Sequence, residues 1–371
     1  MRWAWIELDG EALRKNTERL ATLVRPKALM AVVKANAYGH GGVWAAWHAL
    51  AGGATWLAVA TSDEALGLRR AGLTCPILVL GTIPPEDVLQ AIRADISVTI
   101  PDRTWIELLS GPARSAAAAL KVHLKIDTGM GRIGVRPEEA SAMARDIRQN
   151  GAFLLEGVFS HLAASEDDGP YTELQIARFR QALLDIGELP PVIHLQNSAG
   201  ILGARVPEAT MARSGILLYG LAPGGRTPVP DGFHPVLSLK ARAVQTKVVD
   251  AGQAVGYGLS WIAAERTMIA TLPVGYADGW PRALSNVGRV IHKGAFYPVV
   301  GRVSMDSVTI ALPPDAACAV GDTFTLIGSD GGCRITADDV AAQAGTIGYE
   351  IVTGLTRRLP RLDAASGSPV A

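Results

Sequence analysis

The chain has 371 residues, which suggests about two domains, and 49% hydrophobic with 19% charged residues is an ordinary globular composition. Lys plus Arg and Asp plus Glu balance at 35 each, so the overall charge favours neither nucleic acid nor a membrane surface as a partner. Three scattered cysteines without metal-ligand spacing fit a reducing compartment. No secretory signal or bilayer-spanning stretch is apparent. We therefore expect a cytoplasmic protein that binds a small molecule.

The first two thirds of the chain alternate between short apolar runs and amphipathic helical patterns. The apolar runs lie at 29–33, 56–60, 76–80, 96–100, 122–126, 155–159, 192–195 and 211–218. Helical patterns lie at 11–23, 63–71, 85–93, 137–150 and 171–186. Eight such strand and helix units predict an α/β fold, an N-terminal (β/α)8 TIM-like barrel over residues 10–230. An open doubly wound sheet is the competing fold.

The pattern changes after a Pro- and Gly-rich stretch at 220–232, which is typical of a domain boundary. Short alternating or β-branched segments follow, and they predict strands at 237–248, 267–272, 288–291, 295–299, 307–311 and 323–327, with one helix near 336–344. We expect residues 231–371 to form a mainly β C-terminal domain that the strand 1–9 joins. Asp278 and Arg282 are candidates for an ion pair within it.

Lys34 ends the first apolar run of the predicted barrel. Burial of an amine disfavours its charged form, so we expect a lowered pKa and a neutral amine able to act as a nucleophile or a base. Schiff-base chemistry needs such a group. The alternative is a lysine that ends a strand at the surface.

Further polar residues lie at or just beyond the ends of later strands. In a barrel this edge carries the active site, and the loops after the seventh and eighth strands commonly bind phosphate. Small residues beside Ser198 and Gly215 would supply backbone N–H groups there. Taken singly these are weak signals, since such pairs usually form turns. The polar residues concerned are Lys125, Asp127, Arg132, Ser160, His161, Asn197 and Ser198, together with Arg213 within the eighth run.

Residues 129–134 satisfy the G-x-G-x-x-G pattern of dinucleotide-binding turns between a strand and a helix. This is the basis of a second hypothesis, a dinucleotide-dependent oxidoreductase. The pattern belongs to the fifth unit of the chain, however, and Arg132 would intrude into the phosphate turn, which argues against that hypothesis.

The predicted β domain contains three islands of polar and aromatic residues, at 255–258, 273–282 and 299–306. Tyr257 stands between two glycines, as in active-site loops that need close backbone approach, although an aromatic residue capping a turn is as compatible. Met305 fits core packing unless it lines a pocket.

Together these segments resemble alanine racemase, a pyridoxal phosphate enzyme. The resemblance rests on AVVKANAYGHG at 31–41, HLKIDTGMGRIGV at 123–135, ARSGILLYGLAP at 212–223, VGYG at 255–258, and GYADGWPR with GRVSMD at 275–282 and 301–306. The departures are Gln196 before Asn-Ser and Ser307 after Met-Asp. The ordered set covers nearly the whole chain and is far more specific than any one motif.

The resemblance implies that L- and D-alanine are interconverted with two bases. Lys34 would hold pyridoxal 5'-phosphate and act on the D face, while Tyr257 would act on the L face. In the family this tyrosine comes from the partner subunit, which implies a homodimer with shared sites. His161 and Arg213 would belong to its proton network, with Arg213 facing the pyridine nitrogen.

The resemblance also implies roles for the other site residues. Arg132 would orient the substrate carboxylate, and Lys125 matches a lysine that is carbamylated in some members. Tyr276 and Met305 would form the substrate entrance. The phosphate and its surroundings would be held by Tyr38, Asn197, Ser198, Gly215 and Ile216.

Several other functions stay open at this point. A racemase of broader or different range, acting on serine or lysine, is the nearest alternative, and a basic amino acid decarboxylase on a related fold is another. A pyridoxal phosphate-binding homeostasis protein would lack the β domain. A biosynthetic role, supplying D-alanine to the cell wall, and a catabolic role are equally compatible with these residues.

Overall fold

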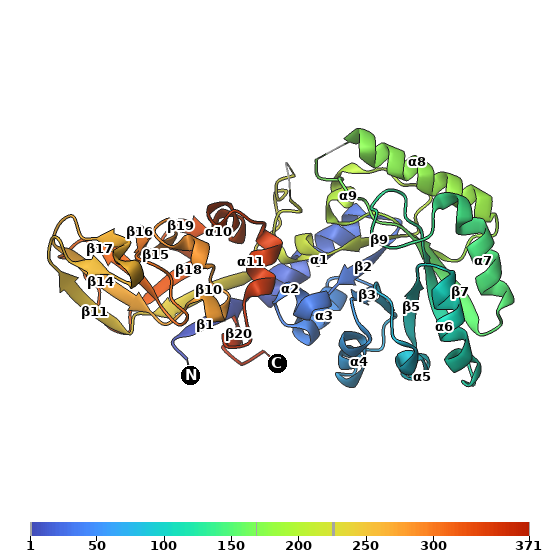
Figure 1. Cartoon of the computed structure of the whole chain (residues 1–371), viewed down its shortest axis with the longest axis horizontal. Coiled ribbons are helices and arrows are strands. Elements are labelled where there is room, and N and C mark those ends of the chain that lie inside the picture. The colour runs from blue at the N-terminus through green and yellow to red at the C-terminus, as the bar shows by residue number, and fades with distance from the viewer. Residues whose placement is uncertain (1, 168, 225–226, 371) are drawn as a thin grey trace.

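The computed structural model describes residues 2–167, 169–224 and 227–370. The chain forms an elongated molecule in which a helix-covered barrel lies at one end and a domain of mainly β structure at the other (Figure 1). This confirms the predicted fold class. Within the described residues, no helix combines the length and the apolar composition needed to cross a bilayer.

Eight parallel strands close into the barrel, because the first of them pairs with the last. The strands are β2 (Ala28–Val32), β3 (Trp56–Val59), β4 (Ile77–Val79), β5 (Ile96–Ile100), β6 (Leu120–Lys125), β7 (Phe153–Phe159), β8 (Val192–His194) and β9 (Met211–Ser214). Their side chains are almost all buried, as expected for strands covered on both faces. One prediction was too long: β9 stops at Ser214, and the short 3-10 helix η3 (Ile216–Tyr219) follows, because the backbone turns at Gly215.

Helices cover the outside of the barrel (Figure 1). They are α1 (Gly10–Leu23), α3 (Gly42–Ala51), α4 (Ser62–Arg70), α5 (Val88–Arg93), α6 (Arg103–Arg114), α7 (Ala140–Gln149) and α8 (Gly169–Ile186), with α9 (Ser198–Gly203) after β8. Side chains that cap first-turn N–H groups set several starts: Asp9 accepts from Ala12 in α1, and Thr61 accepts from Glu64 in α4.

The second domain is built on a mostly antiparallel sheet in the order β11-β14-β17-β16-β15-β18-β10-β1-β20. Its strands are β1 (Ala4–Leu8), β10 (Leu237–Arg242), β11 (Gln245–Val249), β14 (Thr267–Leu272), β15 (Arg289–His292), β16 (Ala295–Val300), β17 (Val308–Leu312), β18 (Thr323–Asp330) and β20 (Arg361–Asp363). The amino-terminal strand β1 pairs with β10 and β20, so the chain begins in this sheet before it builds the barrel.

The single strand expected at 237–248 is two strands, because the chain changes partners between them. β10 pairs with β1 and β18, whereas β11 pairs with β14. At the crossing, the Ala243 N–H donates to the Asp322 carbonyl and the Val244 N–H donates to the Thr271 carbonyl.

The expected ion pair between Asp278 and Arg282 is also wrong. Asp278 is fully buried and pairs with Arg2, whose Nη2 lies 2.7 Å from Oδ2. Arg358 also approaches this carboxylate, with Nε 3.3 Å from Oδ1. The pairing joins the amino terminus to the second domain, a contact that spacing along the chain does not indicate.

Candidate active site

A cavity of about 380 Å³ opens at the carboxyl ends of the barrel strands. Ten of the predicted site residues line it, brought together from segments that span most of the barrel sequence. They are Lys34, Tyr38, Lys125, Arg132, His161, Asn197, Ser198, Arg213, Gly215 and Ile216. No Asp or Glu is among the described residues that line it. Two lysine and two arginine side chains without a lining carboxylate suit an anionic small molecule.

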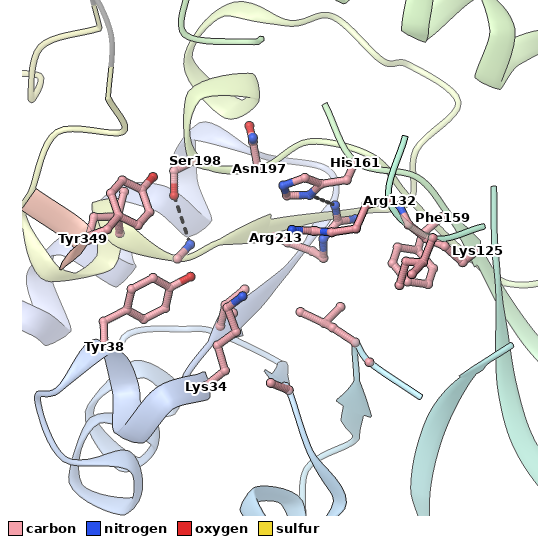
Figure 2. A pocket seen from close by; sticks show the side chains of 17 residues that line it. Lys34, Tyr38, Lys125, Arg132, Phe159, His161, Asn197, Ser198, Arg213 and Tyr349 are labelled. Carbon is pink, nitrogen blue, oxygen red and sulfur yellow. Dashed lines mark hydrogen bonds between the residues drawn. The ribbon is translucent and has the colours of Figure 1, made fainter. Parts of the chain in front are cut away.

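Lys34 and Tyr38 enter the cavity from an unusual turn, labelled α2 (Lys34–Tyr38) in Figure 1. Its residues 35–38 all have φ between 51° and 54°, so this is a left-handed helical turn. Such a conformation costs about 1–2 kcal/mol for each residue with a Cβ. The turn is held by Glu64, which accepts the Ala35 N–H at 2.7 Å, and by Asn36, which accepts the Gly42 N–H at 2.7 Å. The two side chains consequently point into the same space (Figure 2).

The surroundings of Lys34 favour its neutral form. Burial lowers the pKa of its amine, and the nearby Arg132 guanidinium lowers it further, while Glu64 opposes them. The amine is therefore a better nucleophile and proton acceptor than an exposed lysine at the same pH.

Ser198 and Tyr38 lie at one side of the cavity, as Figure 2 shows, and Gly215 lines the cavity beside them. The Ser198 hydroxyl accepts the Gly215 N–H at 3.0 Å. A Cβ on Gly215 would lie 3.1 Å from Cζ of Tyr38 and closer still to its hydroxyl, so only glycine fits beside this tyrosine. Burial raises the pKa of the Tyr38 hydroxyl, which keeps it a neutral donor. Ile216 follows directly, and hydroxyl and backbone donors of this kind are what a phosphate requires.

Asn197 and Gln196 shape the same corner without needing a ligand to explain them. Asn197 caps α9, since its Oδ1 accepts the Gly200 N–H at 2.8 Å. Gln196, the residue that departs from the family motif, is buried. Its Nε2 donates to the carbonyls of Gly200 and Ala204, and its Oε1 accepts from the Lys27 amine. Gln196 thus holds the loop behind Ser198 and does not itself line the cavity.

Arg213 is buried at the end of β9 and is held by several acceptors. Its Nη2 donates to the carbonyls of Ser160 and Leu195 at 2.8 and 3.0 Å and lies 3.2 Å from Nδ1 of His161. Burial lowers the pKa of Arg213 to about 9, which leaves it a cation at neutral pH. Burial and the Arg213 charge lower the pKa of His161 far below its ordinary value, so this imidazole is neutral and can accept from the guanidinium.

Lys125 is buried at the end of β6, and its Nζ has no hydrogen-bond partner among the described residues. The amine lies 4.8 Å from the centre of the Phe159 ring. Burial, assisted by Arg213, lowers the pKa of Lys125 well below the ordinary value. Arg132 is solvent-exposed at the rim and completes this side of the cavity.

Tyr257, Tyr276 and Met305 do not line the cavity; they lie on the second domain, 72%, 43% and 53% exposed. Tyr257 begins the short 3-10 helix η4 (Tyr257–Leu259), and Gly256 packs against the backbone of Arg302. The other two islands meet where the N–H groups of residues 276 and 277 donate to the carbonyls of residues 304 and 305, both at 3.0 Å. The three predicted islands thus contact one another on the second domain, and Tyr257, Tyr276 and Met305 lie outside the lining of the Lys34 cavity.

The sequence reasoning missed two aromatic residues of the cavity lining, Tyr349 and Phe159. Tyr349 comes from α11 (Gly348–Gly354) in the second domain, and its hydroxyl donates to the Pro223 carbonyl at 2.9 Å. No recognisable spacing surrounds it, so nothing local could have found it. Phe159 ends β7, and its ring contacts Arg213 and Lys125. An aromatic residue within an apolar run predicts core packing, so nothing in the sequence indicated that Phe159 lines the cavity.

The G-x-G-x-x-G segment does not form a dinucleotide-binding turn. The Asp127 carboxylate accepts the N–H groups of Gly129, Met130 and Gly131 at 2.8–3.1 Å, so the loop wraps around its own acid. A dinucleotide phosphate would need these same donors. The closed barrel also excludes the strand order of that fold.

Comparisons with known proteins agree with this geometry. Residues 8–223 match the family described as alanine racemase, N-terminal domain, and residues 236–363 match alanine racemase, C-terminal domain. An alanine racemase of Symbiobacterium thermophilum is 42% identical over 365 residues, with 97% of each chain covered. One of Desulfovibrio desulfuricans is 40% identical over 366 residues, with 97% of this chain and 98% of that protein covered.

Solved structures are equally similar. The alanine racemase from Bacillus anthracis with bound L-Ala-P has a TM-score of 0.93 at 36% identity and covers 100% of this chain and 97% of that one. The alanine racemase from Bartonella henselae with covalently bound pyridoxal phosphate has a TM-score of 0.88 at 30% identity, covering 98% and 100%. The resemblance drawn from the ordered motifs is confirmed, and this chain belongs to the alanine racemase family.

Proposed function

We propose that this chain interconverts L- and D-alanine with pyridoxal phosphate held in the barrel cavity. The observation that carries the proposal is the half-buried Lys34 amine, which lines the same cationic cavity as Arg213, a cavity whose described lining holds no carboxylate. The donor set fits the cofactor: the hydroxyls of Tyr38 and Ser198 and the backbone at Ile216, all in the cavity lining, offer neutral donors to a phosphate, while the Gly215 N–H holds the Ser198 hydroxyl in place. Family membership and a neighbour with covalently bound pyridoxal phosphate support the same cofactor.

Bound pyridoxal phosphate would supply the electron sink that acidifies the α-hydrogen of an amino acid. Lys34 would hold the cofactor through its amine and, once displaced by substrate, take or return the proton on one face. Arg132 would orient the substrate carboxylate at the rim, as a guanidinium fork suits that group. Arg213 would present a cation to the pyridine nitrogen, which disfavours protonation of the ring.

The second base, Tyr257, would come from a second copy of the chain. Within one chain it is 72% exposed and outside the cavity lining, and exposed apolar side chains follow it closely in the sequence, Leu259 at 68% and Ile262 at 55%. A clustered apolar surface of this kind is typical of an interaction site. A twofold dimer would place Tyr257, Tyr276 and Met305 of each copy at the cavity of the other.

The decisive experiment is a D/L-alanine exchange assay with and without added pyridoxal phosphate, followed by chiral chromatography. We expect cofactor-dependent conversion that Lys34→Ala lowers by about a thousandfold or more, the effect of losing a positioned base. Lys15→Ala, which removes an exposed lysine of α1, serves as the matched control. If Lys34→Ala racemised alanine as fast as the unmodified chain, the proposal would fail. Turnover of L-serine and L-lysine in the same assay measures the breadth of specificity.

The shared site is tested by mixing two inactive variants, Lys34→Ala and Tyr257→Phe, after partial unfolding and refolding. A mixed dimer would have one site with both defects and one with neither, so random pairing should restore about one quarter of the activity. No recovery, with dimers demonstrated by sedimentation, would show that each site is built from one chain.

We also propose that Lys125 carries a carbamate. Its neutral amine would attack carbon dioxide at carbon, lose a proton, and become an anion that offsets the neighbouring Arg132 and Arg213 charges. The unpartnered Nζ supports this. Enzyme equilibrated with ¹³C-bicarbonate should show one carbamate carbon resonance that is absent from Lys125→Ala and kept in Lys121→Ala; an unchanged spectrum in Lys125→Ala would contradict it.

A further inference from the structure

A row of buried polar side chains leads away from Arg213 through the barrel interior. Nη1 of Arg213 lies 2.7 Å from Nδ1 of His194, and Nε2 of His194 lies 2.9 Å from Nδ1 of His123. Nε2 of His123 lies 3.2 Å from Oε2 of Glu156, which also accepts the hydroxyl of Ser97. Both histidines are fully buried, and His194, His123 and Glu156 all lie outside the cavity lining.

The direction of each hydrogen bond in this row follows from its ends. A guanidinium only donates, so Nδ1 of His194 must accept, and a neutral His194 then carries its hydrogen on Nε2. That hydrogen is donated to Nδ1 of His123, which therefore carries its own hydrogen on Nε2 and donates it to the carboxylate. One arrangement satisfies all three bonds, provided that both rings are neutral and Glu156 accepts.

The electrostatics agree with this arrangement. Burial lowers the pKa of both His194 and His123, which keeps them neutral. Burial by itself would raise the pKa of Glu156, but the hydrogen bonds from His123 and Ser97 leave it below its ordinary value. The ammonium of Lys121, 3.9 Å from Oε1, further favours the ionised carboxylate.

The backbone is adapted to admit the His123 ring. Gly157 on β7 lies opposite His123, and a Cβ there would collide with the imidazole. The pairing of β6 with β7 also shifts register between Val122 and His123. His194 is fixed from its other side by Phe159, whose ring stacks on it at 4.7 Å with an interplanar angle of 2°. Rings held in this way cannot rotate to relieve a wrong tautomer.

We propose that Glu156 is a positioning residue for Arg213, acting through the tautomers of His123 and His194. Without an acceptor at position 156, His123 can carry its hydrogen on Nδ1, which would face the hydrogen of His194. If His194 then carried its hydrogen on Nδ1, this N–H would face the guanidinium N–H of Arg213, and neither group could accept a hydrogen bond. The carboxylate thus decides, two residues away, whether the guanidinium keeps its acceptor. The functional consequence rests on the proposed role of Arg213 beside the cofactor; the tautomers do not.

The tautomers can be read directly from long-range ¹H–¹⁵N spectra of the full chain labelled in its histidine rings, with and without pyridoxal phosphate. We expect His194 and His123 each to carry one hydrogen, on Nε2. Glu156→Leu, which removes the acceptor, should abolish this single pattern, whereas Glu156→Gln, whose amide oxygen still accepts, should keep it. Ser97→Ala is the matched control, since it removes the other partner of the carboxylate and should leave both rings unchanged.

The holoenzyme provides the functional readout. Glu156→Leu should lower kcat for alanine about tenfold, the lower end of what supporting partners contribute at metal sites, with KM within about twofold, and should shift the absorbance of the bound cofactor. Glu156→Gln should restore both. The proposal is overturned by a hydrogen on Nδ1 of His194, by a charged ring in the unmodified chain, or by equal effects of Glu156→Leu and Ser97→Ala. These spectra need neither substrate nor turnover, so they can confirm the tautomers even in a chain that does not racemise alanine. A failure of the tautomer proposal is therefore distinguishable from a failure of the proposed function. The unmodified chain alone decides the tautomers if Glu156→Leu does not fold.

Discussion

Gly215→Ala tests whether Tyr38 is a phosphate donor whose place depends on the missing Cβ. The new methyl would lie 3.1 Å from Cζ of Tyr38 and closer still to the hydroxyl, so the hydroxyl would have to move by about 1 Å to reach ordinary contact distance. The ring is packed against Tyr219 and Tyr349, with centroids 5.2 and 6.1 Å away, which limits where it can go. Losing a hydrogen bond to a charged group costs about 1.5–3 kcal/mol, so we expect the Kd for pyridoxal phosphate to rise about 10- to 150-fold.

The assay is a fluorescence titration of the apoenzyme with pyridoxal phosphate, carried out as a double-mutant cycle. In the Tyr38→Phe background the colliding oxygen is gone, so Gly215→Ala should cost less than about threefold there. Gly203→Ala, at the end of α9 where an added Cβ meets no atom within 4 Å, is the matched control. Equal costs of Gly215→Ala in both backgrounds would refute the reasoning, because the methyl would then act independently of the Tyr38 hydroxyl.

Three further predictions concern stability. Lys125→Met should raise the free energy of unfolding by about 1 kcal/mol in urea titrations of enzyme freed of carbon dioxide, because it removes a buried unpartnered amine; a loss of stability would contradict this. Asp278→Ala should lower it by about 3 kcal/mol, because Arg2 is left half-buried without its carboxylate, and a change below about 0.5 kcal/mol would show that the pair contributes little. The urea midpoint should fall as the pH drops below about 6.5. The histidines of the unfolded chain then bind protons, whereas the buried histidines of the folded chain stay neutral, so the free energy of unfolding falls by up to about 1.4 kcal/mol per pH unit for each histidine. Burial lowers the pKa of His40 in the folded chain to about 4, so its contribution to stability is lost between about pH 6.5 and pH 4. A urea midpoint that is the same at pH 7.5 and pH 5.5 would contradict this prediction. The histidines concerned are His40, His123, His161 and His194.

Much of the barrel could be predicted because strand ends and helix faces leave local signals. Lys34 stands where an apolar run stops, Ser198 stands just beyond a later run, and Arg213 lies within the last one; in a closed parallel barrel the carboxyl ends of all these strands meet at one rim. The site residues of the barrel therefore followed from position along the chain once the fold class was recognised. The family resemblance added their expected roles, which periodicity could not supply.

The left-handed turn after Lys34 shows the limit of that reasoning. Ala35 and Ala37 disfavour φ near 50°, and only Asn36 between them tolerates it readily, so the conformation persists through bonds to Glu64 and within the loop. Only the assembled barrel brings Glu64 to this turn, because Glu64 lies on α4, the helix that follows β3.

Sequence by itself determined the order of the barrel strands and helices, the edge at which the cavity lies and the position of Lys34 there, because these depend on patterns of a few residues. The tertiary structure alone decided that Tyr349 of the second domain reaches the cavity, that Asp278 pairs with Arg2, and that Glu156 is linked to Arg213 through two histidines. Those contacts join residues dozens to hundreds of positions apart. They depend on strand register, a missing Cβ and the docking of one domain on another, none of which leaves a trace in local periodicity.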